Sequence, residues 1–149
     1  MKNIRRFILG SLFIFCSSAL HAESEFLNSG QVLPSTLPFS EVVVVGDLLL
    51  LSGQIGNLPG TLEIAEGGIA GETRQVMENI RTSLNAHGYD LTNLVKCTVF
   101  LADMAEWDAF NQVYADYFEA GRYPARSAFG TSGLAFNARV EVDCIGAKE

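Results

Sequence analysis

Histidine and cysteine are scarce in this sequence. Its 149 residues include two histidines and three cysteines, and no CxxC pair, HExxH segment or His/Cys cluster occurs. Transition-metal sites need several such ligands at close spacing, so a transition-metal site is not expected. No GxSxG segment, the nucleophile motif of serine hydrolases, is present either. The only histidine after residue 22, His87, precedes Gly88, where we expect it to cap a helix and favour the helix dipole rather than activate a serine.

Basic residues are also few. Ten Lys and Arg face seventeen Asp and Glu, which gives a net charge of −7. Such an acidic chain is a poor electrostatic partner for nucleic acid or for an anionic lipid surface. The glycine-rich segment 56–71 lacks the lysine and the spacing of a phosphate-binding loop, and no GxGxxG is present. We interpret this segment as a connector.

The first 22 residues have the pattern of a secretory signal peptide. Three basic residues precede an apolar run over about residues 7–16, and a stretch of small residues ends at Ala22. The run is shorter than the ~20 residues that span a bilayer. We expect cleavage after Ala22 and a periplasmic or secreted single domain of residues 23–149; the alternatives are an uncleaved anchor or a misjudged start codon. Loss of the three positive charges would change the net charge from −7 to −10.

The first half of the mature chain predicts a hairpin. Residues 23–38 are polar, with a glycine and two prolines, and predict an irregular lead-in. The next stretch, SEVVVVGDLLLLSGQIG, places two apolar runs around Gly46-Asp47, a two-residue hairpin signal. The near-continuous apolarity of these runs indicates that both sheet faces are covered, one by helices and the other by something else, such as another subunit.

Two segments have the periodicity of amphipathic helices. Residues 71–88 carry an apolar stripe ending at the left-handed cap Gly88; its members are Val76, Met77, Ile80 and Leu84. Residues 103–121 begin with Asp103 and Glu106 at capping-box spacing. An aromatic stripe follows, which we interpret as core: Trp107, Phe110, Tyr114, Tyr117 and Phe118.

The remaining strands complete an α+β fold. Residues 94–102 alternate, with Val95, Cys97, Val99 and Leu101 on one face. Two further strands are expected within 125–135 and 138–148. The predicted order β-β-α-β-α-β-β fits one sheet with both helices on one face. The opposite face would be bare in a monomer, and a bare apolar face implies oligomerisation.

Cys97 and Cys144 both fall on apolar faces of predicted strands. A buried thiol in such a place is usually an inert small hydrophobe, so we favour two free thiols. Export to an oxidising compartment keeps a disulfide open as the alternative, although bridge geometry is demanding.

Charged residues mark the last two strands. Arg139, Glu141 and Asp143 share one face of the final strand, and Arg126 opens the strand before it. A solvent-exposed face is the ordinary interpretation for Glu141, and a salt bridge with a neighbouring carboxylate is the ordinary one for Arg126. The alternative is that Arg126 meets an anion that arrives with a substrate.

Five segments together resemble the RidA (YjgF) family of reactive-intermediate deaminases, over about residues 38–147. They are LSGQIGNLPGT, GGIAGETRQVMENI, LVKCTVFLADMAEWDAFNQVYADYF, YPARSAFG and ARVEVDCIGA. The resemblance implies a chorismate-mutase-like α+β fold, a homotrimer with a central barrel, and active sites in the clefts between subunits. It implies a hydrolase like 2-iminobutanoate/2-iminopropanoate deaminase that needs no cofactor and converts 2-imino acids to 2-oxo acids and ammonia.

The resemblance also assigns the site. Arg126 would bind the substrate carboxylate and Glu141 would place the hydrolytic water. Phe39, where family members often have tyrosine, would pack over the substrate and favour a more apolar one. Three further residues are expected near the substrate: Ser52, Asn111 and Ala128.

Two other functions remain open from the sequence. The chain could be a non-catalytic trimer that binds small carboxylates through Arg126, as a sensor or scavenger. It could also be a holdase-like interaction protein in which Arg126 and Glu141 form a structural ion pair. Function does not follow from fold, so the site itself has to decide.

Overall fold

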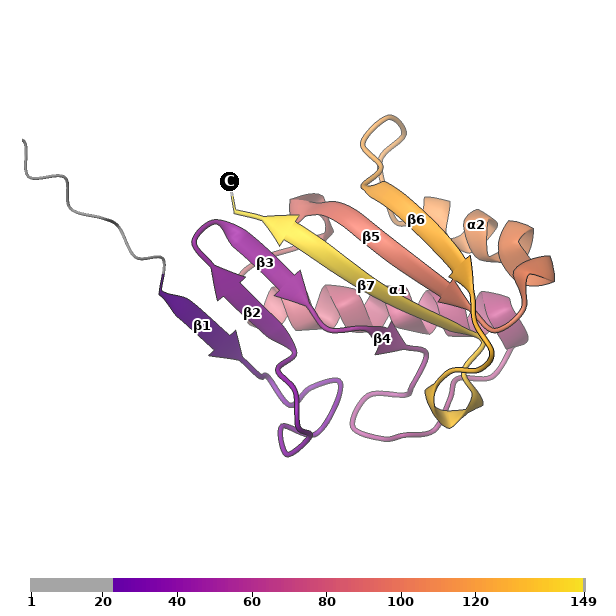
Figure 1. Ribbon diagram of the computed structural model, residues 1–149, viewed down its shortest axis with the longest axis horizontal. Helices are drawn as coiled ribbons and strands as arrows, with labels where there is room; N and C mark the ends of the chain where they lie inside the picture. Colours follow the sequence, from indigo (N-terminus) through magenta and orange to yellow (C-terminus); the bar gives the residue numbers. More distant parts are fainter. Residues whose placement is uncertain (1–22, 149) are drawn as a thin grey trace, which may run out of the picture.

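The computed structural model describes residues 23–148, so the expected signal peptide lies outside the described residues. Seven strands form one sheet in the order β1-β2-β3-β7-β5-β6, with the short β4 paired to β7 (Figure 1). The strands are β1 Ser24–Leu27, β2 Val42–Val45, β3 Leu48–Leu51, β4 Gln54–Ile55, β5 Leu94–Leu101, β6 Ala125–Gly130 and β7 Val140–Ala147. All pairs are antiparallel except β5 and β6, which run parallel.

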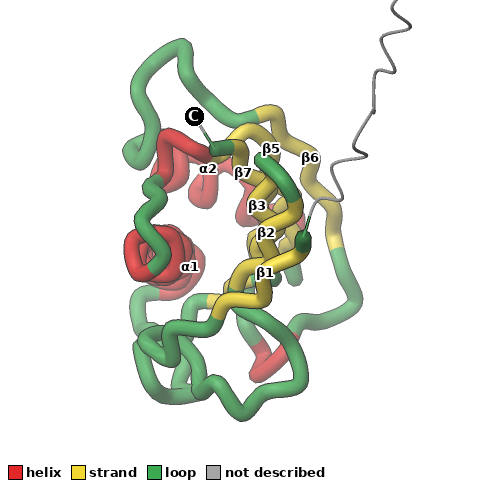
Figure 2. Tube along the Cα trace, turned by 90° about the vertical axis from the view of Figure 1, so that its left-hand side faces the viewer, coloured by secondary structure: helices red, strands yellow, loops and turns green. Residues whose placement is uncertain are grey.

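Two helices, α1 (Gly68–Ala86) and α2 (Trp107–Ala115), lie on the same side of the sheet (Figure 2). This arrangement confirms the predicted α+β sandwich. The predicted stripe of α1 is fully buried against the sheet, from Val76 to Leu84. Gly88 follows the helix with a φ of 82°, as expected for a left-handed cap. His87 is the C-cap residue of α1, as predicted.

The hairpin prediction is confirmed, and the lead-in prediction is partly wrong. Gly46, with a φ of 59°, begins the turn between β2 and β3. Residues 24–27, predicted to be irregular, form the edge strand β1 against β2. An edge strand pairs on one side only, so its side chains can be polar and exposed, and its sequence then lacks the apolar signal of an inner strand.

Alternation in the later strands holds with one exception. In β7, Val140, Val142 and Cys144 are buried, while Glu141 and Asp143 face the other side. In β5, Val95 was predicted to face the core, but it is exposed and Leu94 is buried instead. A register shift between residues 94 and 96 is the reason, because a bulge reverses the alternation locally.

The prediction of two free thiols is wrong. Cys97 and Cys144 form a disulfide across β5 and β7, with their Cα atoms 4.1 Å apart. The two residues stand directly opposite each other in the antiparallel register, which is the relation that a cross-strand bridge needs. The sequence did not indicate that these two strands are neighbours in this register, so it could not choose between the two states.

The start of α2 also differs from the prediction. Asp103 accepts a hydrogen bond from the Ala105 N–H at 2.8 Å and caps a 3₁₀ turn, Met104–Glu106, that precedes the helix. Glu106 does not complete a capping box; its carboxylate accepts from Arg139 Nη1 at 2.6 Å. The helix ends at Ala115, so Tyr117 and Phe118 pack against the core from the segment that follows it.

The sheet face away from the helices carries exposed apolar side chains. Leu50 lies opposite Ile145 in the β3–β7 pair, and both are exposed, as is the neighbouring Leu48. Phe26 and Phe129 extend this face toward the two edges of the sheet. An apolar face of this extent fits the expectation of an oligomer, which stays a prediction. Within residues 23–148, neither helix has the length and apolarity needed to cross a membrane.

Candidate active site in two halves

Arg126 lies on the edge strand β6 and points to the helix side of the sheet. It stands opposite Cys97, whose side chain is in the core, and it reaches the aromatic residues of α2. Its guanidinium carbon lies 4.7 Å from the ring centre of Trp107 and 4.6 Å from that of Tyr114. Its Nη2 donates to Asn111 Oδ1 at 2.7 Å. The aromatic faces attract the cation and restrict its orientation.

No carboxylate neutralises this guanidinium within residues 23–148. The ion pairs there involve Arg81, His87 and Arg139, and Arg126 takes part in none of them. Arg139 shows the contrast, because both Glu72 and Glu106 accompany it. The interpretation of Arg126 as a salt-bridge residue is therefore not supported, because no carboxylate of the described chain pairs with it.

A hollow of about 360 Å³ opens beside Arg126. Asn111, Tyr114 and Tyr123 are among its walls. The Tyr114 hydroxyl is buried without a hydrogen-bond partner. Burial raises the pKa of Tyr114 to about 12, against the opposing effect of the Arg126 charge. The phenol thus stays neutral at physiological pH, and the positive charge in this hollow remains uncompensated.

Glu141 lies in a second hollow, of about 230 Å³, on the other face of the sheet. Apolar side chains make up most of its wall, including Phe39, Leu62 and Phe136. Burial raises the pKa of the Glu141 carboxyl, and the negative charge of Asp143 raises it further. A carboxylate in such a place can accept a proton at neutral pH more readily than an ordinary surface glutamate.

Gly53 lets the backbone pass close to the Glu141 carboxylate. A Cβ on residue 53 would overlap Glu141 Oε1 and crowd the Cδ and Cγ atoms behind it. Gly53 precedes β4, whose Ile55 stands opposite Glu141 in the sheet. The glycine is thus required for the observed position of the carboxylate, a role that the sequence did not reveal.

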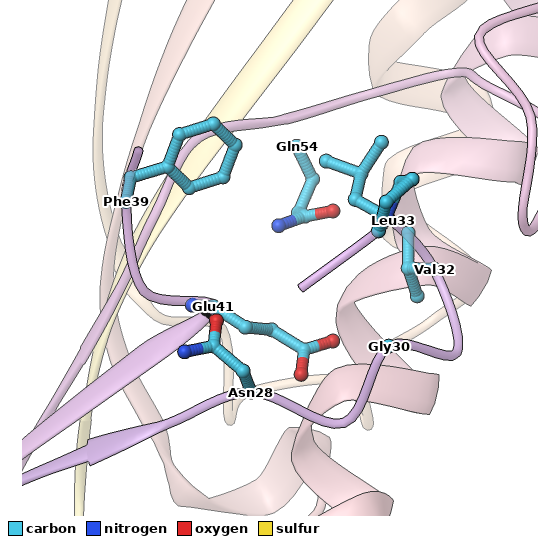
Figure 3. A pocket seen from close by; sticks show the side chains of 8 residues that line it. Asn28, Gly30, Val32, Leu33, Phe39, Glu41 and Gln54 are labelled. Atoms are coloured by element: carbon cyan, nitrogen blue, oxygen red, sulfur yellow. Dashed lines mark hydrogen bonds between the residues drawn. The ribbon is translucent and has the colours of Figure 1, made fainter. Parts of the chain in front are cut away.

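Phe39 also lines a third, much smaller hollow. Figure 3 shows Phe39 and Gln54 around it, with the Glu41 carboxylate below. Its volume of about 10 Å³ leaves room for no more than one water molecule. The buried Gln54 Oε1 has no protein partner and could accept a hydrogen bond from such a water. We therefore treat this hollow as part of the scaffold rather than as a ligand site.

Glu41 fixes the segment that carries Phe39. Its carboxylate accepts from Ser83 Oγ at 2.6 Å and from the Ser29 N–H at 2.8 Å, and His87 Nε2 lies 3.3 Å away. Burial opposes the charged form, but these hydrogen bonds together hold the pKa of Glu41 below its usual value. This network links α1 to the lead-in, and no local pattern in the sequence indicates it.

The predicted site residues therefore form two groups in one chain. Arg126 and Asn111 share the first hollow, and Ala128 lies two residues further along the same strand. Phe39 and Glu141 share the second hollow. Ser52, next to Gly53, donates its hydroxyl hydrogen to the Ser40 carbonyl oxygen at 2.7 Å.

The two groups do not meet within a single chain. Arg126 is level with Cys144, three residues along β7 from Glu141, and two strand spacings separate β6 from β7. Strand geometry then puts the Cα atoms of Arg126 and Glu141 roughly 14 Å apart. Their side chains also leave opposite faces of the sheet, because Glu141 lies three positions, an odd offset, from Cys144.

The comparisons with known proteins identify the family. A family model described as "Endoribonuclease L-PSP" matches residues 29–148, which is most of the chain. The chain belongs to this family, the RidA (YjgF) family. The RidA fold is a chorismate-mutase-like α+β sandwich, and the sheet and helices of this chain match it.

Relatives of the RidA family cover most of the described chain. A RutC family protein of Pyrococcus horikoshii is 42% identical over 112 residues, 75% of this chain and 88% of its own length. The human 2-iminobutanoate/2-iminopropanoate deaminase is 37% identical over 108 residues, 72% of this chain and 78% of its own. The crystal structure of a putative endoribonuclease from Thermotoga maritima is 36% identical, with a TM-score of 0.78 over 84% of this chain and 98% of its own.

Two further features of this RidA chain were not predicted from the sequence. Trp107 and Tyr114 were predicted as core residues, yet they also hold the Arg126 guanidinium. Their spacing fits the core and gives no sign of this second contact. Phe136 was not singled out, because nothing in its neighbourhood signals the left-handed backbone, with a φ of 56°, that it adopts at the Glu141 hollow.

Proposed function

We propose that this protein is an exported hydrolase that converts reactive 2-imino or 2-enamino acids to 2-oxo acids and ammonia. The observation that carries the proposal is the Arg126 guanidinium, held by aromatic faces and Asn111, with no carboxylate partner in the described chain. Relatives named as imine deaminases, 37 to 40% identical, support the same activity.

Arg126 would bind the substrate carboxylate. A guanidinium presents a planar pair of N–H donors that matches the two oxygens of a carboxylate, so it fixes the orientation of the substrate as well as its charge. Asn111 occupies one side of the fork. The remaining donors are free to meet an anion in the adjoining hollow.

Glu141 would deliver the water. The imine carbon C2 is electrophilic, and more so once its nitrogen is protonated. Glu141 takes a proton from water as the oxygen attacks C2, and a carbinolamine forms. Glu141 returns this proton to the nitrogen, which becomes an ammonium leaving group. The C–N bond then breaks as the hydroxyl proton of the carbinolamine passes to Glu141, which releases ammonia and leaves the 2-oxo acid. Glu141 finally gives that proton to solvent. General acid–base help of this kind contributes ~10²–10⁴-fold.

The active site would form between copies of the chain. Arg126 and Glu141 leave opposite faces of one sheet, so a single chain does not present both groups to one small substrate. A cyclic oligomer brings the two different patches of neighbouring copies together at each interface. The exposed apolar sheet face supports such an assembly, and the family resemblance makes a homotrimer the expected form.

Export would place this activity in the periplasm or outside the cell. The basic and apolar pattern of residues 1–22 supports a signal peptide. The Cys97–Cys144 disulfide supports the same location, because disulfides persist in oxidising compartments. N-terminal sequencing of protein recovered from the expressing cell tests this part, and a mature chain that begins at Glu23 is expected.

RNA cleavage, which the description of the family model suggests, is less well supported. The net charge of −7 opposes binding of a phosphate backbone. Non-catalytic binding of a small carboxylate would use Arg126 in the same way and is the main alternative. The experiment has to separate that alternative from hydrolysis.

The test is the decay of imines generated in situ from a panel of amino acids by an amino-acid oxidase. Wild type should accelerate the decay and release ammonia. Glu141→Gln should lower kcat/KM by roughly 10²–10⁴-fold. Arg126→Lys should lower kcat/KM by roughly 10- to 100-fold, since lysine keeps the charge but lacks the planar pair of N–H donors. Arg122→Lys and Glu63→Gln, both exposed and outside the two hollows, are the matched controls.

Two results would count against this function. Equal decay of every imine with and without wild type would remove the enzyme. Loss of 2-oxo acid binding in the Arg126 variant, with no imine hydrolysed by any variant, would leave a carboxylate-binding protein.

A further inference from the structure

We infer that the Glu141 hollow selects imino acids with bulky apolar side chains, and that Phe136 is a specificity-determining residue. The inference rests on the proposed function, because it names the substrate class of the same site. It concerns the part of the substrate that neither Arg126 nor the water touches.

The wall of the hollow is apolar on several sides. Its side chains come from three separate parts of the chain: Leu33, Leu37 and Phe39 from the segment before β2, Ile55 and Leu62 from β4 and the loop after it, and Phe136 from the turn before β7. Glu141 is the only charged side chain among the residues that line it. A polar or charged substrate side chain would therefore lose its hydrating water without gaining a hydrogen-bond partner other than Glu141, which the reaction itself needs.

The volume fits a large side chain. Cavities of roughly 150 Å³ lined by leucine, isoleucine and phenylalanine already take a benzene molecule. The Glu141 hollow measures about 230 Å³. It can therefore hold a branched aliphatic or phenyl group together with the reacting carbon. A methyl group would leave most of the apolar wall without a partner.

Phe136 is held at this wall by an unusual backbone. Both Phe136 and Asn137 are left-handed, with φ of 56° and 58°. The Asn137 N–H donates to the Leu134 carbonyl oxygen at 3.3 Å, and the Ala138 N–H donates to Ala135 at 3.0 Å, which closes the turn. A left-handed phenylalanine is costly, and such conformations persist at sites where the side chain is needed.

The ring of Phe136 gains little from the fold itself. It is 54% exposed and does not belong to the core. Phe39, 45% exposed, lines the same hollow. Two exposed aromatic rings beside the half-buried Glu141 carboxyl leave an apolar surface next to the reacting group, which a substrate side chain can cover.

The backbone of Phe136 supplies a clean variant. Phe136→Gly keeps the left-handed turn, which glycine adopts without strain, and removes only the ring. Leu62→Asn adds a polar group to another part of the wall. Leu58→Asn is its matched control, because Leu58 lies in the same loop with similar exposure, 39% against 44%, and does not line the hollow.

The experiment compares kcat/KM for the imines derived from leucine and phenylalanine with that for the imine derived from alanine. Wild type should prefer the bulky imines by at least about tenfold. Phe136→Gly and Leu62→Asn should bring the preference below about threefold, while Leu58→Asn retains it. Equal rates on all three imines in wild type would overturn the inference, as would an unchanged preference in both hollow variants.

Two additional measurements separate this inference from the proposed function. Calorimetry with 4-methyl-2-oxopentanoate and pyruvate measures the affinity of the Glu141 hollow for a larger and a smaller 2-oxo acid without catalysis. Selective binding of the larger acid, lost in Phe136→Gly, supports the inference even if no imine is hydrolysed. Light scattering reports the oligomer, and a changed mass in both hollow variants with an unchanged preference would assign the hollow to a subunit contact and overturn the inference.

Discussion

Gly53→Ala should greatly reduce activity while leaving stability almost unchanged. The new Cβ would overlap the Glu141 Oε1 atom, so the carboxylate has to move. The atoms in its way are all at the flexible end of the Glu141 side chain, and no backbone atom is among the nearest three. The steric cost is therefore small. Alanine also reduces the freedom of the unfolded chain, which contributes ~0.4–1 kcal/mol in the stabilising direction.

The loss of activity follows from geometry. A misplacement of about 1 Å at a reacting group can cost ~10²-fold in rate, and complete loss of the general base would cost up to ~10⁴-fold. We expect kcat/KM to fall by roughly 100-fold and the free energy of unfolding in urea to change by less than about 1 kcal/mol. Imine decay and urea titration on the same preparation provide the two values.

Gly130→Ala is the matched control for this variant. A Cβ there would meet the flexible Met104 side chain at 2.9 Å, and neither residue lines the Glu141 hollow, so stability should respond similarly and activity should not. In the Glu141→Ala background, Gly53→Ala should have no further effect, because the group that it displaces is absent. Full activity in Gly53→Ala, or an equal loss in both backgrounds, would refute the proposed role of the Glu141 position.

Three other outcomes test the charges and the bridge. Asp143→Asn removes a negative charge that raises the pKa of Glu141, so the acid limb of the kcat/KM profile should move to lower pH; an unmoved limb would mean that another group titrates. Replacing both Cys97 and Cys144 by alanine should lower the free energy of unfolding by about 4 kcal/mol, from loop closure over a sequence separation of 47; an unchanged urea midpoint under oxidising conditions would contradict the bridge. Hydrogen bonds lower the pKa of Glu41 in the folded protein, so its contribution to stability is present above the unfolded pKa and is lost as pH falls below about 4.3. The decrease in the free energy of unfolding at acid pH should therefore be smaller in Glu41→Gln than in wild type. Identical pH profiles of stability in the two proteins would contradict this role of Glu41.

Local patterns in the sequence predicted the fold well. The α1 stripe and the Gly46-Asp47 hairpin depend on contacts within a few residues, which periodicity and turn chemistry describe directly. The errors came where distant segments meet. The bulge at Val95 and the Cys97–Cys144 bridge depend on how β5 and β7 align, and the chain alone does not state that register.

The candidate site was also predicted only in part. Arg126 and Glu141 could be named from the family resemblance, and the strand period placed Glu141 on its face. The environment of each group could not be predicted. The aromatic cage around Arg126, the close passage of Gly53 and the left-handed Phe136 arise from packing between elements far apart in the sequence.

The measurement that tests the central claim most directly is complementation between two inactive variants. Arg126→Ala and Glu141→Ala chains are mixed in equal amounts, unfolded and refolded together, and imine decay is compared with that of each variant alone. If Arg126 of one copy works with Glu141 of the next, random assembly gives an intact pair at about one quarter of the interfaces of a cyclic oligomer, and activity should return to about one quarter of wild type. Mixed oligomers that form but stay inactive would contradict the account, because both groups would then have to come from the same chain.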